Sequence, residues 1–229
     1  MSDPDLKRLI KCHDPLLPLI YEFNFWPGRY IHPSWLEGLI ENDLFNRLKE
    51  SRRAGQRLSP VILLKFGLDR SCFFNFEDPL RRLALLNGEA LLKLVYLAGV
   101  SVHAGEISRV IEREAVLSLK KSLGEEPYLF ALKRAPFLAG RIEFPPYPLK
   151  TTDYAGFGDL VYESGMKVLE ACLGEEEASY RKRLVLKLPR ALVKDFGERA
   201  SFEHKEAASL MLKKILLNEV DPEWGPFFT

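Results

Sequence analysis

Residues 85–138 read LLNGEALLKLVYLAGVSVHAGEISRVIEREAVLSLKKSLGEEPYLFALKRAPFL, with leucine and other apolar residues recurring at helical spacing. The pattern predicts a helix from 88 to about 102 and a long helix over 105–123 that ends at Gly124. Apolar positions wrap most of the way around this long helix, which is typical of a buried helix. We therefore expect the stretch to form the central hairpin of a helical body.

The composition of the whole chain favours the same class. The 39 leucines outnumber the 9 isoleucines and 11 valines, and leucine favours helices whereas β-branched residues favour strands. Several pairs place a capping residue before a proline that suits the first helical turn: Asp3-Pro4, Asp14-Pro15, Ser59-Pro60, Asp78-Pro79 and Asp221-Pro222. We expect an all-α protein, in which residues 184–188 form either one short β element or more helix.

The other helices can be placed from caps and periodicity. They are expected over 3–12, just after Pro33 with Ser34 as cap, near 41–54, and over 59–66, 78–87, 125–134, 156–173, 175–183 and 201–218. Two inner faces are predicted: Val161, Gly165, Val168, Leu169 and Cys172 on one helix, and Ala208, Met211, Leu212, Ile215 and Leu216 on another. The basic run 181–183 is interpreted as the positive end of a helix.

Residues 141–153 (RIEFPPYPLKTTD) contain three prolines and predict an extended connection. Its aromatic residues suggest that it contacts the body of the protein. The chain of 229 residues is therefore expected to form a single helical domain over 1–229, with a two-lobe alternative whose boundary lies near 141–153.

Charge and cysteine content exclude several classes of partner. The 33 basic and 32 acidic residues give a net charge of +1, which does not favour nucleic acid or a polybasic membrane anchor. Three widely spaced cysteines are neither a disulfide framework nor a zinc ribbon. The N-terminus resembles no secretory signal, and no apolar run is long enough to span a membrane. We expect a cytoplasmic protein without direct membrane insertion.

No catalytic signature stands out. The sequence lacks the nucleophile-elbow, Walker, zinc-helix and paired-cysteine motifs, so we predict no catalytic, metal-binding or cofactor-binding residues and no cofactor. The four histidines are too scattered in sequence for a local metal site. The alternative is a small helical enzyme whose site is assembled from distant segments, around His32, His103 or Arg109.

The segment 23–36, FNFWPGRYIHPSWL, is the most distinctive part of the chain. Its candidate partner-binding residues are Trp26, Arg29, Tyr30, His32 and Trp35, because aromatic and arginine side chains dominate interface hot spots. The same residues are suited to anchoring a rigid loop against the helices, which is the interpretation that the pattern favours. Both hypotheses stay open at this stage.

Two further sets of residues are candidates for partner binding. Arg109 and Arg113 are spaced to share one exposed helix face. The last residues, EWGPFFT, carry Trp224, Phe227 and Phe228, and this end either folds back onto the body or serves as a docking peptide.

Residues 23–36 and 85–138, with the helix entry GEISR at 105–109 and the stretch EEPYLFALKRAPFL, resemble the SctK family, also called the YscK or HrpD type. The family consists of accessory proteins of bacterial type III secretion systems. The resemblance covers about a third of the chain and does not extend beyond residue 150.

The resemblance implies a predominantly helical, non-enzymatic adaptor of the sorting platform. Such a protein links the cytoplasmic domain of the inner-membrane ring protein SctD to the pod protein SctQ. Its place would be the bacterial cytoplasm, at the cytoplasmic face of the inner membrane, where it is held through its partners. A helical adaptor or chaperone of an unrelated pathway is the further alternative.

Overall fold

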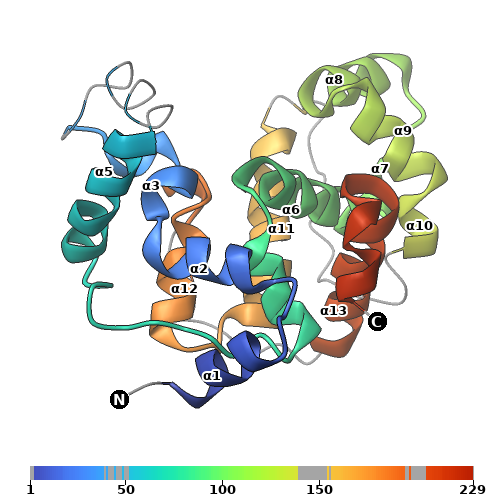
Figure 1. The fold of residues 1–229 in the computed structure, drawn as a ribbon. Helices are drawn as coiled ribbons and strands as arrows, with labels where there is room; N and C mark the ends of the chain where they lie inside the picture. The colour runs from blue at the N-terminus through green and yellow to red at the C-terminus, as the bar shows by residue number, and fades with distance from the viewer. Residues whose placement is uncertain are drawn as a thin grey trace. The chain divides into compact units, whose positions relative to one another are not determined.

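The computed structural model describes residues 3–38, 40, 44, 48, 52–138, 154, 156–193, 196 and 205–228. Within these residues the chain is helical or irregular and forms no strand, which confirms the all-α prediction (Figure 1). The helices, with 3-10 and π segments labelled η, are α1 (Pro4–Lys11), α2 (Leu17–Phe25), α3 (Pro27–Tyr30), η1 (Pro33–Trp35), α5 (Arg52–Lys65), η2 (Pro79–Leu85), α6 (Gly88–Val102), α7 (Ala104–Ile107), α8 (Arg113–Leu123), α9 (Glu125–Lys133), α10 (Ala135–Leu138), α11 (Phe157–Leu173), α12 (Ala178–Val185), η3 (Arg190–Leu192), α13 (Lys205–Ile215), η4 (Leu216–Val220) and η5 (Pro222–Phe227).

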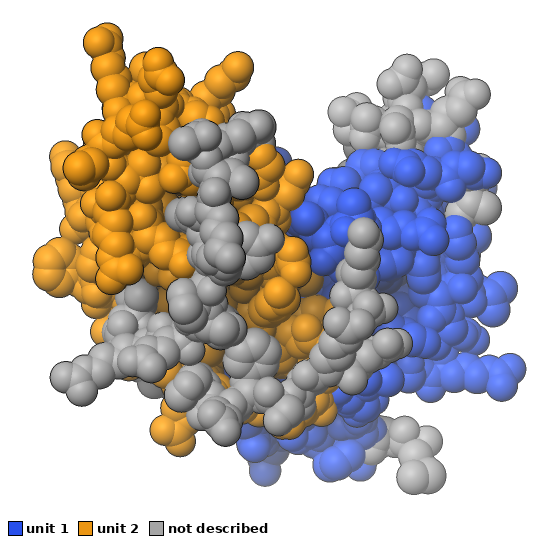
Figure 2. Space-filling model, turned by 180° about the vertical axis from the view of Figure 1, so that it is seen from behind, with its two compact units in different colours: residues 1–91, 176–194 blue, residues 92–175, 195–229 orange. Residues whose placement is uncertain are grey.

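The chain divides into two compact units, coloured separately in Figure 2. Unit 1 comprises residues 1–91 and 176–194, and unit 2 comprises residues 92–175 and 195–229. The chain therefore passes between the units inside α6, between α11 and α12, and after η3. The single domain stays a prediction, and the alternative boundary at 141–153 lies outside the described residues.

Unit 1 is built around an aromatic cluster formed by Phe23, Phe73, Phe76 and Tyr180. The ring centroids of Phe73 and Tyr180 lie 4.9 Å apart, and Phe23 meets Phe76 edge to face at 5.6 Å. The Tyr180 hydroxyl donates a hydrogen bond to the carbonyl of Arg81, and burial raises its pKa well above the ordinary value. The cluster joins α2, α12 and the irregular segment between α5 and η2.

Asn24 holds that irregular segment in place. Among the described residues, the segment pairs with no strand that would bind its backbone groups. Its side-chain amide donates to the carbonyls of Ile20 and Phe73, at 2.9 and 2.7 Å. Its side-chain oxygen accepts from the backbone N–H of Phe73 at 2.7 Å. Asn24 is fully buried, so its hydrogen bonds satisfy polar groups that would be costly to leave unpaired.

α5 corrects the prediction of a helix that begins at Ser59-Pro60. The helix already begins at Arg52 and holds Pro60 in its interior. The Ser59 hydroxyl instead accepts a hydrogen bond from the backbone N–H of Gly28, at 3.2 Å, and so joins α5 to α3. The helix expected near 41–54 falls mostly outside the described residues.

Unit 2 depends on a close crossing of α6 and α11, visible in Figure 1. A Cβ atom on Gly99 would lie 1.8 Å from the carbonyl oxygen of Val161, and one on Gly165 would lie 1.9 Å from that of Val95. The two backbones therefore touch at these glycines. All the residues predicted for the inner faces of α11 and of the last helices are buried, which confirms those faces.

The predicted long helix over 105–123 is wrong. The chain forms the short α7 and the separate α8, with residues 108–112 outside any helix. The Ser108 hydroxyl donates to the Gly105 carbonyl at 2.9 Å, and the β-branched pair Val110-Ile111 follows, so local bonds and low propensity end α7. Nor is α8 a buried hairpin helix: only its Ala115, Leu119 and Leu123 side is buried.

Several predictions about helix ends were also tested. Asp3, Asp78 and Asp221 act as N-caps as predicted. Gly88 begins α6, as predicted for the helix from 88 to about 102, and the side-chain oxygen of the preceding Asn87 accepts a hydrogen bond from the N–H of Ala90 at 2.8 Å.

Three more local features can be compared with the sequence. His32, not Ser34, caps η1, because its Nδ1 accepts from the N–H of Ser34 at 3.3 Å. Pro136 lies inside α10, in its first turn, where proline is tolerated. The segment 184–188 completes α12 and then turns, so no β element forms there.

The C-terminal aromatic residues fold back onto unit 2. The rings of Trp224 and Phe227 lie 5.4 Å apart, and Phe228 is buried. The Lys213 ammonium on α13 donates a hydrogen bond to the Phe228 carbonyl. This arrangement is the first of the two alternatives that the sequence left open for the tail.

Candidate interaction surfaces

The break between α2 and α3 explains how the segment 23–36 is held. Pro27 has no N–H, so the Phe23 carbonyl lacks its normal helical donor. The buried Tyr30 hydroxyl supplies the donor instead, at 2.7 Å. Burial raises the pKa of Tyr30 far above its usual range, so this hydroxyl stays protonated. Tyr30 therefore serves the fold and is not available to a partner.

His32 and Trp35 are also tied to the body of unit 1. The His32 backbone N–H donates to the Leu186 carbonyl at 2.8 Å, and the Trp35 indole N–H donates to the Leu188 carbonyl at the same distance. The Ser34 hydroxyl accepts from the N–H of Arg190 at 2.9 Å. These bonds fasten residues 32–35 to the chain that follows α12.

Trp26 and Arg29 lie on the outer side of the same segment. The Arg29 guanidinium lies 4.5 Å from the centre of the Trp26 ring and 3.0 Å from the Glu22 carboxylate. Tyr21, 46% exposed, meets Trp26 edge to face at 5.1 Å. We call Tyr21, Glu22, Trp26 and Arg29 the Trp26 surface. It presents the side-chain types that contribute most to protein interfaces.

Two buried cations complete unit 1, and the sequence analysis did not single out either of them. Arg183 is fully buried and donates to four backbone carbonyls, those of Asn24, Leu68, Ser71 and Ser179. The Asn24 carbonyl is the second acceptor left open near Pro27, because Gly28 donates to Ser59 instead. Arg183 thus joins α2, α12 and the segment after α5. Burial lowers its pKa, with Tyr30 opposing the shift.

Lys187 is the second buried cation. Its ammonium donates to the carbonyls of Ala84 and Leu86, at 2.5 and 2.7 Å, and lies 4.9 Å from the centre of the Tyr30 ring. Among the described residues it forms no ion pair with a carboxylate. Burial lowers the pKa of Lys187 to about 7, while the charge of Glu22 opposes the shift.

The lowered pKa of Lys187 predicts a pH-dependent stability. The unfolded chain keeps this lysine protonated up to about pH 10, whereas the folded chain releases the proton near pH 7. Since the unfolded state binds more protons in this window, the free energy of unfolding rises between pH 7 and 9, by at most about 1.4 kcal/mol per pH unit. Urea unfolding across pH 6.5–9 measures the slope. Lys187→Met should flatten it; an unchanged slope in this variant would contradict the assignment.

Unit 2 contains the other candidate residues. Arg109 and Arg113 are both exposed, but they do not share a helix face, because one follows α7 and the other begins α8. Trp224 and Phe227 are half-buried, and Phe228 is buried. The structure does not bring the two arginines together as the spacing predicted.

His103 connects α11 to the turn before α7. Its Nε2 lies 2.8 Å from the Ser164 hydroxyl, and its Nδ1 lies 2.8 Å from the Glu106 carboxylate. A serine, a histidine and a carboxylate in this order resemble a catalytic triad. However, Ser164 is buried in the middle of α11, where the backbone N–H groups face helical carbonyls rather than a substrate oxygen. The three residues are arranged to hold α7 against α11.

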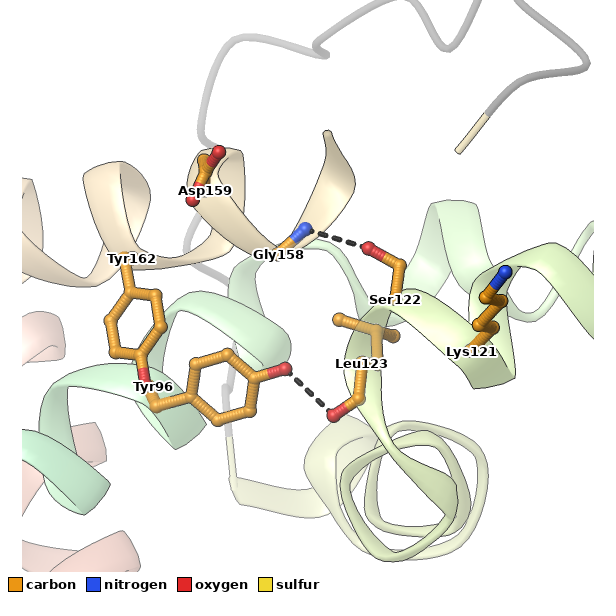
Figure 3. Close-up of a pocket in the computed structure, with 7 residues that line it drawn as sticks. All are labelled: Tyr96, Lys121, Ser122, Leu123, Gly158, Asp159 and Tyr162. Atoms are coloured by element: carbon orange, nitrogen blue, oxygen red, sulfur yellow. Dashed lines mark hydrogen bonds between the residues drawn. The ribbon is translucent and has the colours of Figure 1, made fainter. Parts of the chain in front are cut away.

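A shallow groove of about 530 Å³ lies between the end of α8 and the start of α11 (Figure 3). The rings of Tyr96 and Tyr162 line it, with their centres 4.7 Å apart and their planes tilted by 44°. Burial raises the pKa of Tyr96 to about 12, and its hydroxyl donates to the Leu123 carbonyl. Ser122 accepts from the N–H of Gly158. These polar atoms already have partners, and the other polar groups that line the groove are the exposed side chains of Lys121 and Asp159 and the Tyr162 hydroxyl.

No group of three or more His, Cys, Asp or Glu side chains in the described part of the chain is placed to hold a metal ion. No described helix has the length and apolar character required to cross a bilayer.

An all-helical chain with aromatic and cationic side chains on exposed helix faces has the character of a helical interaction protein. Residues 19–227 match the family model described as YOP proteins translocation protein K (YscK), and the chain belongs to this family. It is thus an accessory protein of a type III secretion system, with protein partners in the secretion apparatus. No curated protein and no solved structure was found to match the chain.

Proposed function

We propose that this protein is a non-enzymatic adaptor that links the cytoplasmic domain of the inner-membrane ring protein SctD to the pod protein SctQ. It acts in the bacterial cytoplasm, at the inner membrane, and is held there by its partners. Family membership supports a role in the secretion apparatus. The observation that carries the proposal is the Trp26 surface, where an exposed arginine stacks on a half-buried tryptophan.

An adaptor needs two contact surfaces on a stiff body. In unit 1, the Trp26 surface is anchored from behind by the hydrogen bond from Tyr30 and by the bonds of Arg183. In unit 2, the half-buried rings of Trp224 and Phe227 and the exposed Arg109 and Arg113 are the candidates for the second surface. Anchored side chains lose little conformational freedom on binding, which favours affinity.

Arg29→Glu is expected to weaken binding to one of the two partners at least tenfold, because it reverses the charge at the centre of the Trp26 surface. Its melting temperature should fall only slightly, because Arg29 is exposed and its ion pair with Glu22 lies at the surface. The measurement is co-elution with light scattering, followed by titration calorimetry, using the SctD cytoplasmic domain and SctQ separately.

Two variants provide the controls. Arg70→Glu makes the same charge change at a side chain that is 95% exposed, and its affinities should stay unchanged. Tyr30→Phe should lower stability by about 1 kcal/mol, through the lost bond to Phe23, without weakening either complex. Normal binding by Arg29→Glu would exclude the Trp26 surface, and no complex with either partner would refute the adaptor function.

A further inference from the structure

α5 has an outer face that is exposed in the described part of the chain. Leu58 and Ile62 on its inner side are buried in the core of unit 1. On the opposite side, Val61 and Leu64 are 63% and 70% exposed, and Pro60 beside them is exposed as well. Three apolar side chains thus form one outward patch on a helix that is itself firmly held.

The charges around this patch have a single sign. Residues 51–68 contain four basic residues and no acidic one. Arg57 and Lys65 are exposed on the same outer side as Val61 and Leu64. They are eight residues apart, which is about 12 Å along a helix axis. Neither forms an ion pair with a carboxylate in the part of the chain that the structure describes.

An apolar patch bracketed by two unpaired cations is complementary to an acidic amphipathic helix. Such a helix presents apolar side chains at i and i+3 or i+4, with carboxylates on either side. A lipid surface fits less well, because membrane-binding helices use a longer apolar face that carries large side chains. Three apolar side chains of moderate size and two cations make a small contact, which suits a protein partner.

We propose that the outer face of α5, formed by Arg57, Pro60, Val61, Leu64 and Lys65, binds an acidic amphipathic helix of a protein partner. The inference rests on the adaptor function proposed above and adds a surface distinct from the Trp26 surface. Val61 and Leu64 contact the apolar side of the partner helix, and Arg57 and Lys65 pair with its carboxylates.

Two double variants of the full chain test the two parts of the face. Arg57→Glu/Lys65→Glu reverses its charge, and Val61→Ser/Leu64→Ser removes its apolar centre. Each should weaken the complex with either SctQ or the SctD cytoplasmic domain at least tenfold, measured by titration calorimetry. The charge variant should also lose the salt dependence of binding between 0.05 and 0.5 M NaCl. Matched controls are Ile10→Ser and Arg70→Glu, at exposed positions of unit 1, which should bind normally.

A photo-crosslinking residue in place of Leu64 gives an independent test. It detects the contact directly and does not rely on weakening the complex. The crosslink should map to a helical segment with several acidic residues in the purified partner. A crosslink to a basic or non-helical segment would overturn the proposal.

The outcomes separate the two proposals. If the unchanged protein binds a partner and both double variants bind it equally well, the α5 proposal fails and the adaptor function stands. If the unchanged protein binds neither partner, both proposals fail. Binding to phosphatidylserine vesicles that the double variants lose, with protein complexes unaffected, would overturn the protein partner in favour of a lipid surface.

Discussion

Alanine at Gly99 or Gly165 is expected to prevent stable folding of unit 2. The added Cβ would lie within 2 Å of a backbone carbonyl oxygen on the facing helix, so α6 and α11 would have to separate by more than 1 Å. Interiors at crystal-like density do not absorb such a shift, because every contact along the crossing would be weakened. We expect a loss of about 4 kcal/mol or more, a large share of the 5–15 kcal/mol that stabilises a typical domain.

Urea unfolding followed by circular dichroism measures this loss. Gly105→Ala is the matched control, because no atom lies within 4 Å of a Cβ at this exposed position of α7. It should leave stability unchanged or raise it slightly, through reduced freedom of the unfolded chain. A Gly99→Ala or Gly165→Ala variant within 1 kcal/mol of the unchanged protein would show that the helices do not cross at these glycines.

Arg183→Ala is expected to have the second largest effect, about 4 kcal/mol of lost stability. The substitution removes the donors to four backbone carbonyls from separate segments and leaves a cavity in a site with no exposed surface. Removing a desolvated charge offsets part of the loss, but the carbonyls cannot reach water in the folded state.

The control for Arg183 is its neighbour in the same basic run. Lys182 is exposed, so Lys182→Ala should change the free energy of unfolding by less than about 0.5 kcal/mol. Thermal and urea unfolding of the two variants provide the comparison. Equal stabilities would mean that Arg183 does not hold unit 1 together.

These two sites show what the sequence could and could not predict. The buried face of α11 was predicted because Val161, Gly165 and Leu169 recur at helical spacing, which is a local property. The touching backbones at Gly99 and Gly165 were not predicted, since a glycine within a helix gives no sign of what faces it. The signal that could have indicated this close crossing is a small residue at the centre of each of two apolar helices.

The burial of Arg183 and Lys187 lay beyond sequence reasoning for a similar reason. The run 181–183 is interpreted as the positive end of a helix, and Lys182 and Arg183 do lie in the last turn of α12. Arg183 points inward, where it donates to the Asn24 carbonyl on α2, 159 residues earlier in the sequence, which is open because Gly28 donates to Ser59 instead. The sequence does not show that the backbone near Pro27 and the side chain of Arg183 meet, because only the fold brings them together.

The partner-binding role of the segment 23–36 stays a prediction. The sequence could not divide its residues between those that anchor the segment and those that are exposed. Tyr30 and Trp35 are held by backbone carbonyls, while Trp26 and Arg29 reach the surface. Tyr21 and the outer face of α5 were missed, because an apolar residue in an amphipathic pattern is normally assigned to the core.

The break between α7 and α8 was also not predicted. Continuous apolar periodicity over 105–123 predicts one helix, but the Ser108 hydroxyl donates to the Gly105 carbonyl and the β-branched pair Val110-Ile111 follows, so the helix ends after Ile107. Apolar residues that fit the helical pattern in the sequence are therefore exposed to solvent in the folded chain. Ile111, 91% exposed, is the clearest case.

Simultaneous binding is the most direct test of an adaptor. The purified chain, the SctD cytoplasmic domain and SctQ from the same secretion system would be mixed and separated by size-exclusion chromatography with light scattering. We expect one species whose mass is the sum of all three proteins, and its loss when this chain is left out. A mixture in which SctD and SctQ displace each other from the chain, or in which the chain elutes alone, would contradict the proposed function.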